Sequence, residues 1–140
     1  MANSAFAELR ECEWYGGQGA HLFGILRYDG VLVCMQCLWF GERYRQREFW
    51  PLAADDAASV HLVTAASERG KGLATRLKQY SAGRLREMGF AHLYSRIWWT
   101  NTASLRVSEK AGWSQVGIVL EIQTPWRRVP VRRIFRRRHS

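Results

Sequence analysis

The stretch ASVHLVTAASERGKGLATRL, residues 58–77, joins an alternating apolar segment to a glycine-rich turn and a helical pattern. Before the turn, successive side chains alternate between two faces, which is the period of a β-strand. After the turn, apolar residues recur every three to five positions and form one helical stripe, made of Leu73, Leu77, Tyr80, Leu85 and Met88. The stretch therefore predicts a strand–turn–helix unit.

The turn itself is suited to an anion. Backbone N–H groups and the positive end of the helix dipole converge at the helix N-terminus. Gly70 and Gly72 have no Cβ, so an anion can approach the backbone closely. Arg69 and Lys71 add positive charge. The P-loop is excluded because its Gly-x-x-x-x-Gly-Lys-Ser/Thr spacing is absent, and Thr75 stands where a dinucleotide motif needs its third glycine.

The elements around this unit favour a mixed sheet. Residues 21–45 read as two strands joined by a tight turn at Asp29-Gly30. Downstream we expect a strand, a short helix and two further strands, over residues 91–100, 101–113, 114–123 and 126–135, with Pro130 confining the last strand to an edge. Residues 1–20 fit either a short helix or an edge strand. The fold class predicted is α/β (α+β), with a mostly antiparallel sheet flanked by helices.

Composition predicts one domain. The chain has 140 residues, of which 47% are hydrophobic, and no apolar run reaches the roughly 18–20 residues of a membrane span.

The N-terminus lacks the pattern of a secretory signal, so we expect a cytoplasmic protein. Cys34 and Cys37 lie three apart on a predicted strand and point to opposite faces, so we expect ordinary thiols and no metal.

The positive charge is concentrated at the C-terminus. The net charge is +9, and the last fifteen residues carry seven arginines and no acid. We therefore expect a domain over 1–125 and an Arg-rich segment over 126–140, as an edge strand or a tail. That segment suits RNA, anionic lipid or another anionic partner, and it is equally consistent with a solvated end.

Two segments resemble one family, the GNAT N-acetyltransferases. Residues 69–74, RGKGLA, match the family signature (Gln/Arg)-x-x-Gly-x-(Gly/Ala), and residues 101–113, NTASLRVSEKAGW, resemble its downstream Asn…Lys-x-Gly-Phe segment, with Trp113 in the aromatic place. The resemblance runs from about Leu22 to Ile122. It implies a GNAT-like fold with a shortened N-terminal region, because residues 1–20 are too few for the family's first strand and two helices.

The resemblance also implies a cosubstrate, acetyl-CoA. Backbone groups of one strand segment would run beside the pantetheine arm, and turn amides would hold the pyrophosphate; these residues are Leu62, Val63 and Thr64 on the strand and Arg69, Gly70, Lys71, Gly72, Leu73 and Ala74 in the turn. Asn101 would contact pantetheine or cap the next helix. The acceptor would be a primary amine of a small molecule or a peptide.

The catalytic groups are harder to assign. Amine acetylation needs a base for the ammonium proton and an acid for the thiolate. The family's acidic tyrosine aligns with Ser108, and His61 is a candidate base because histidine titrates near neutral pH. Asp55 and Asp56 could bind a cationic acceptor, and Glu121 is a further candidate base. Alternatives left open are a non-catalytic acyl-CoA-binding module and an RNA- or anionic-surface-binding protein; a homodimer is also compatible with the sequence.

Overall fold

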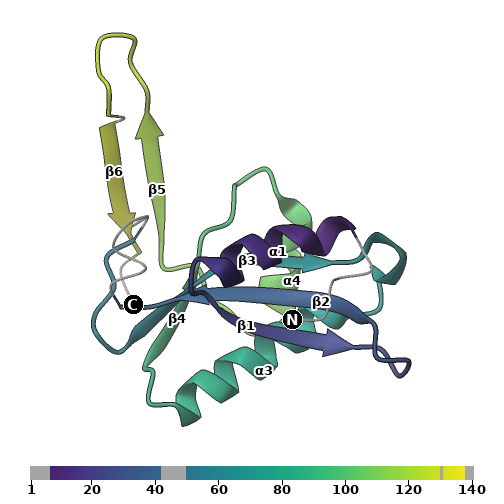
Figure 1. The fold of residues 1–140 in the computed structure, drawn as a ribbon. Helices are drawn as coiled ribbons and strands as arrows, with labels where there is room; N and C mark the ends of the chain where they lie inside the picture. The colour runs from purple at the N-terminus through teal and green to yellow at the C-terminus, as the bar shows by residue number, and fades with distance from the viewer. Residues whose placement is uncertain (1–6, 42–49, 130, 138–140) are drawn as a thin grey trace.

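A computed structural model of the chain describes residues 7–41, 50–129 and 131–137. The elements, in chain order, are η1 (Ala7–Leu9), α1 (Arg10–Gly17), β1 (His21–Leu26), β2 (Leu32–Trp39), β3 (Asp56–Thr64), η2 (Ala66–Glu68), α3 (Leu73–Glu87), β4 (His92–Ser95), α4 (Thr102–Lys110), β5 (Gly117–Ile122) and β6 (Val131–Arg136). The predicted order of strands and helices is therefore confirmed, and the ambiguous N-terminal segment contains a helix (Figure 1).

Four strands form the main sheet, in the order β1-β2-β3-β4. The pairs β1–β2 and β2–β3 are antiparallel, and β3–β4 is parallel. Helices α1 and α3 lie on opposite faces of this sheet (Figure 1). The mixed, mostly antiparallel sheet flanked by helices confirms the predicted fold class.

Each face of the sheet has its own apolar core. Leu9 and Cys12 pack on Met35 and Cys37 beneath α1. On the other face, Leu38 and Ala57 pack with Leu85 of α3, and this cluster is surrounded by Phe23, Phe40, Phe90 and Leu93. Because β2 is central, it contributes to both cores and is buried almost throughout, as its continuous apolar run predicts.

The hairpin between β1 and β2 turns where the sequence predicts. Gly30 donates its N–H to the Arg27 carbonyl over 2.8 Å, and Arg27 donates to the Val31 carbonyl over 2.8 Å. Gly30 has φ +83°, in the left-handed region that favours glycine. The turn places Arg27 and Asp29 at one end of the sheet, which matters for the site described below.

The strand expected over residues 91–100 is shorter in the structure. β4 covers only His92–Ser95, and its pairing with β3 ends at Ser59 and Ser95. Beyond that point, residues 96–100 pair with no strand in the described part of the chain, and Trp98 and Trp99 are 66% and 84% exposed. The prediction was wrong here because apolar composition alone does not show where strand pairing stops.

Strands β5 and β6 form a separate two-stranded antiparallel sheet that projects from the body (Figure 1). Its base is fixed to the core, since Val119 packs against the cluster of Trp39, Trp50 and Ala58. Arg132 pairs with Glu121 across the hairpin. The expected edge position of Pro130 lies outside the described residues.

None of the helices in the described part of the chain is long and apolar enough to cross a membrane. The described His, Cys, Asp and Glu side chains do not gather in groups of three that could hold a metal ion. Cytoplasmic location and a homodimer stay predictions.

Candidate functional site

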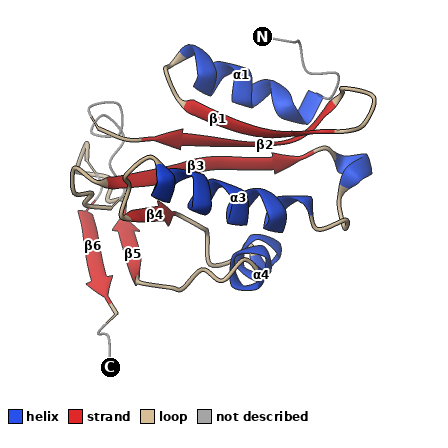
Figure 2. Cartoon of the chain, turned by 90° about the horizontal axis from the view of Figure 1, so that it is seen from below, coloured by secondary structure: helices blue, strands red, loops and turns tan. Residues whose placement is uncertain are grey.

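The main sheet opens at β3. The first part of β3, Asp56–Ser59, pairs with β4, and Val60–Thr64 continues beyond the end of β4. Figure 2 shows β4 beside only one end of β3. On the other side, the register with β2 shifts at this same place: Cys37 faces His61 and Leu38 faces Ser59, so Val60 is an extra residue in β3. Such a bulge bends a strand, and here it accompanies the divergence of β3 from β4.

The opening exposes backbone hydrogen-bonding groups of β3. Ala65 donates its N–H toward β2, to the Val33 carbonyl over 2.8 Å. Because N–H groups alternate sides along a strand, those of Leu62 and Thr64 point to the open edge. An extended ligand can therefore pair with this edge as an added strand would.

The glycine turn lies at the far end of that edge. Gly70 and Gly72 have φ +81° and +76°, and a Cβ at either position would meet no atom within 4 Å. Gly72 is the N-cap of α3, and no side-chain hydrogen bond caps this helix among the residues that the structure describes. The first N–H groups of α3 are thus left for an external acceptor. Both the space around the turn and the N–H donors at the start of α3 are therefore open.

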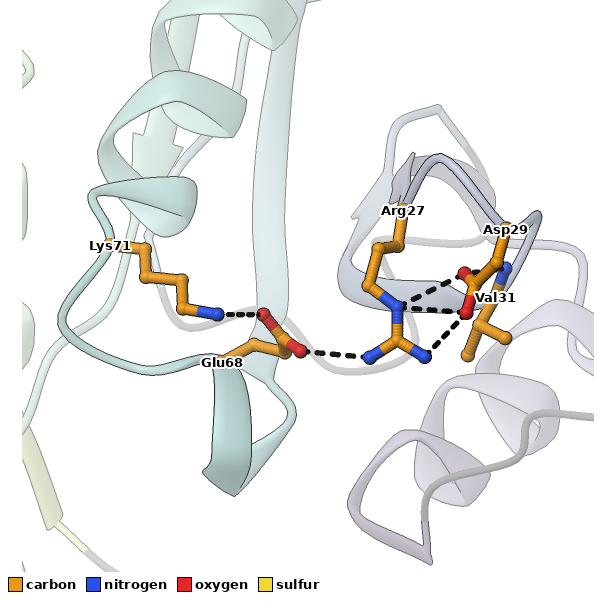
Figure 3. Close-up of polar contacts among 5 residues, drawn as sticks. All are labelled: Arg27, Asp29, Val31, Glu68 and Lys71. Carbon is orange, nitrogen blue, oxygen red and sulfur yellow. Dashed lines mark hydrogen bonds and ion pairs between the residues drawn. The ribbon is translucent and has the colours of Figure 1, made fainter.

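A buried carboxylate braces this turn (Figure 3). Glu68, 8% exposed, accepts from Lys71 Nζ over 2.6 Å and from an Arg27 nitrogen over 3.0 Å. Arg27 also pairs with Asp29 over 2.6 Å. The hydrogen bonds from Lys71 and Arg27 hold the pKa of Glu68 below its usual range. The turn is therefore tied to the β1–β2 hairpin.

This brace changes the expected roles of the two cations. Lys71 is bound to Glu68, so its charge is partly neutralised within the turn. Arg69 donates from Nε to the Thr64 carbonyl over 3.3 Å, which places it at the junction of the open edge and the turn. Sequence reasoning missed Glu68 and Arg27, because their contact joins segments 41 residues apart.

Asn101 caps the second helix after the turn. Its side-chain oxygen accepts from the Ser104 N–H over 3.2 Å, which satisfies one of the first donors of α4. The sequence left two roles open for Asn101, and the structure shows Asn101 in one of them, as the N-cap of α4. A contact between Asn101 and pantetheine stays a prediction.

His61 lies directly after the bulge, on the face covered by α1. Its ring stacks on Tyr15, with centroids 5.4 Å apart and planes at 23°. Its Nε2 atom is buried, lies 3.6 Å from Glu11 Oε2 and makes no hydrogen bond with the described residues. Neither Glu11 nor Tyr15 was a candidate from the sequence, because their contact with His61 joins α1 to β3.

Ser108 lies on α4 and is 8% exposed, with its Oγ unpartnered among the described residues. Helix α4 packs beside α3, where Lys78 is 3% exposed and its Nζ lies 3.8 Å from the Trp113 ring centroid. Burial lowers the pKa of Lys78 to about 8. Sequence reasoning assigned no role to Lys78, although it lies seven residues before Leu85 and therefore on the same face of α3.

Two of the remaining acidic candidates, Asp56 and Glu121, have structural partners. Asp56 accepts from the Ala53 N–H over 2.9 Å and contacts His92 over 2.8 Å, at the end of β3 that is paired with β4. Glu121 pairs with Arg132 on the projecting hairpin. Asp55 is exposed beside Asp56. Only His61 among the titratable candidates lies next to the bulge.

Comparison with known proteins agrees with this geometry. The family model of the acetyltransferase (GNAT) family matches residues 3–113. The chain therefore belongs to the GNAT family of acetyltransferases. None of the curated proteins is similar enough in sequence to match the chain.

Solved structures share the fold at low sequence identity. An N-acetyltransferase from Staphylococcus aureus Mu50 is 18% identical with a TM-score of 0.60, covering 91% of this chain and 72% of that one. A ribosomal-protein-alanine N-acetyltransferase from Brucella melitensis is 18% identical with a TM-score of 0.58, covering 90% of this chain and 72% of that one. The aminoglycoside N-acetyltransferase AAC(6')-Iy, solved in complex with CoA, is 17% identical with a TM-score of 0.64, covering 83% of this chain and 87% of that one. These are likenesses of fold.

Proposed function

We propose that the chain is an N-acetyltransferase that moves an acetyl group from acetyl-CoA to a primary amine of a small molecule or peptide. The observation that carries this proposal is the continuous surface made by the open edge of β3 and the uncapped glycine turn. One part offers backbone groups to an extended chain, and the other offers N–H groups to a diphosphate. Membership of the GNAT family and the CoA complex of a fold neighbour support the same cosubstrate.

Within this proposal, each part of the site has one task. The N–H groups of Leu62 and Thr64 align the pantetheine arm, and the turn from Arg69 to Ala74 holds the pyrophosphate. Acetyl-CoA supplies an activated thioester. A ligand that runs from the turn along the open edge ends beside Val60 and His61, so the reacting carbonyl lies next to the bulge.

His61 is the base that takes the ammonium proton from the acceptor amine. It is the titratable candidate beside the bulge, and histidine is effective near neutral pH. The amine then attacks the thioester directly. A covalent route through cysteine is disfavoured, because all three thiols are buried and burial raises the pKa of Cys34.

The cosubstrate is tested by thermal unfolding with acetyl-CoA and free CoA. A ligand that binds only the native protein should add about 2.7 kcal/mol to the unfolding free energy at a hundredfold excess over its dissociation constant. Gly72→Glu should abolish this gain, because it adds a negative charge where the diphosphate binds. Gly89→Glu is the matched control, since Gly89 also has positive φ and open space but follows the opposite end of α3.

Wild-type protein that gains no stability from either ligand would rule out the cosubstrate.

Turnover with a panel of amines then separates the enzyme from a non-catalytic acyl-CoA-binding module. The second reading is favoured by one observation: at the place of the family's acid stands the buried Ser108 hydroxyl, which makes no hydrogen bond with any residue in the described ranges. Binding without transfer to any amine would support it.

A further inference from the structure

On the α1 face of the sheet, His61 contacts two side chains of the same helix. Glu11 and Tyr15 are four residues apart on α1, so they share one face of that helix. His61 meets both side chains: its ring stacks on Tyr15, and its Nε2 faces the Glu11 carboxylate at 3.6 Å. One element therefore fixes both the plane and one nitrogen of the imidazole.

The distance decides what the carboxylate can do. At 3.6 Å the contact is longer than a hydrogen bond of about 2.7–3.2 Å, but an opposite charge within about 4–6 Å stabilises the charged form of a titrating group. Glu11 thus acts mainly on the imidazolium, which exists only after His61 has taken a proton. The burial of Nε2 strengthens this effect, because a buried charge is poorly solvated.

Two other described neighbours of His61, Cys37 and Tyr15, add no competing charge. Cys37 lies opposite His61 in the β2–β3 register. A hydrogen bond with the Cys12 thiol, together with burial, raises the pKa of Cys37 far above neutrality. The Cys37 thiol is therefore uncharged at neutral pH, and Tyr15 contributes its ring. Among the side chains that the structure describes around the imidazole, Glu11 is the charged one.

We propose that Glu11 is a positioning residue for His61, and that it stabilises the imidazolium formed when His61 takes the proton of the acceptor amine. This inference rests on the proposed function. With Nε2 turned to Glu11, the proton is accepted at Nδ1. The neutral amine nitrogen forms the new C–N bond as the C–S bond breaks. The second amine proton ends on the thiolate sulfur, and His61 returns its proton to solvent.

The first test does not depend on turnover. The His61 imidazole resonances, followed by NMR as a function of pH, should show that Glu11→Ala loses the imidazolium proton at a lower pH than wild type, because one stabilising charge is gone. Glu11→Gln should move the same way, since it keeps the shape but lacks the charge. Glu87→Ala is the matched control, as it removes an exposed carboxylate paired with Arg84 at the far end of α3.

Kinetics provide the second test. Glu11→Ala should lower kcat about tenfold, which is less than the roughly 10²–10⁴-fold that general acid–base catalysis contributes because His61 itself is kept, and it should leave the KM for acetyl-CoA unchanged. The acid limb of its pH–rate profile should move to lower pH, and Glu87→Ala should match wild type. His61→Asn should remove that limb.

Equal imidazole titrations in wild type and Glu11→Ala would overturn the inference, whether or not the protein transfers acetyl groups. A shifted titration in a protein that does not bind acetyl-CoA would instead confirm the His61–Glu11 pair and reject the proposed function. A fall in kcat with an unmoved acid limb would assign Glu11 a structural role only.

Discussion

Lys78 is a buried cation in the helix that follows the glycine turn. Its side chain is 3% exposed, and its ammonium group lies over the Trp113 ring. A cation–π contact of this kind is worth about 2 kcal/mol when desolvated. It does not restore hydration, so burial lowers the pKa of Lys78 from 10.5 to about 8. Below pH 8 the folded protein must therefore hold a poorly solvated charge.

Replacing this charge should stabilise the fold at neutral pH. The folded pKa lies below the unfolded one, so wild-type stability should rise as the pH increases from about 8 to 10.5, by on the order of 3 kcal/mol from this group. Lys78→Met should unfold at higher urea at pH 7, with a gain of about 1–3 kcal/mol, and should lack this rise. The check is urea denaturation at pH 7 and pH 10. A difference between the proteins that is the same at both pH values would contradict the account.

At the scale of single residues, the sequence predicts groups whose chemistry is local. Gly70 and Gly72 adopt positive φ and leave open space, as the turn requires. Asn101 caps α4, as its position predicts. Glu11 and Glu68 could not be predicted, because each acts through a partner from a distant segment, His61 in one case and Arg27 in the other.

At the scale of elements, the β5–β6 hairpin is attached to the body through a close contact at its base. A Cβ on Gly117 would lie 2.6 Å from the Phe135 carbonyl oxygen and 2.6 Å from the Trp50 ring. Arg136 lies over the same ring, 5.6 Å from its centroid. A hairpin of two strands is marginally stable alone, so this anchoring fixes its direction.

Gly117→Ala should therefore weaken the hairpin. The new methyl group meets a backbone oxygen that cannot move without disturbing the ladder, and overpacking of this kind costs about 1–3 kcal/mol. Urea denaturation measures the loss. Gly83→Ala on α3 is the control, since its Cβ would meet open space and alanine should gain about 0.5–1 kcal/mol in a helix. Equal stability of Gly117→Ala and wild type would contradict the close packing.

At the scale of the whole molecule, the order of elements follows from periodicity and turn residues, as the Asp29-Gly30 hairpin and the strand–turn–helix unit illustrate. The length over which two strands pair does not follow from periodicity or turn residues. Residues 96–100 are apolar enough for a strand, yet β4 ends at Ser95 because β3 diverges at the bulge. The separate β5–β6 sheet is likewise set by contacts with Trp50, far away in sequence. The roles of the C-terminal arginines stay predictions.

Amide hydrogen exchange tests the central claim most directly, because it reports on the open edge and the glycine turn together. Saturating acetyl-CoA should slow exchange at Leu62 and Thr64, whose N–H groups point to the open edge, and at Gly70 to Ala74 in the turn. Amides of β1, which lie across the sheet from β4, should change little. Unchanged exchange at both the edge and the turn under saturating acetyl-CoA would contradict the account.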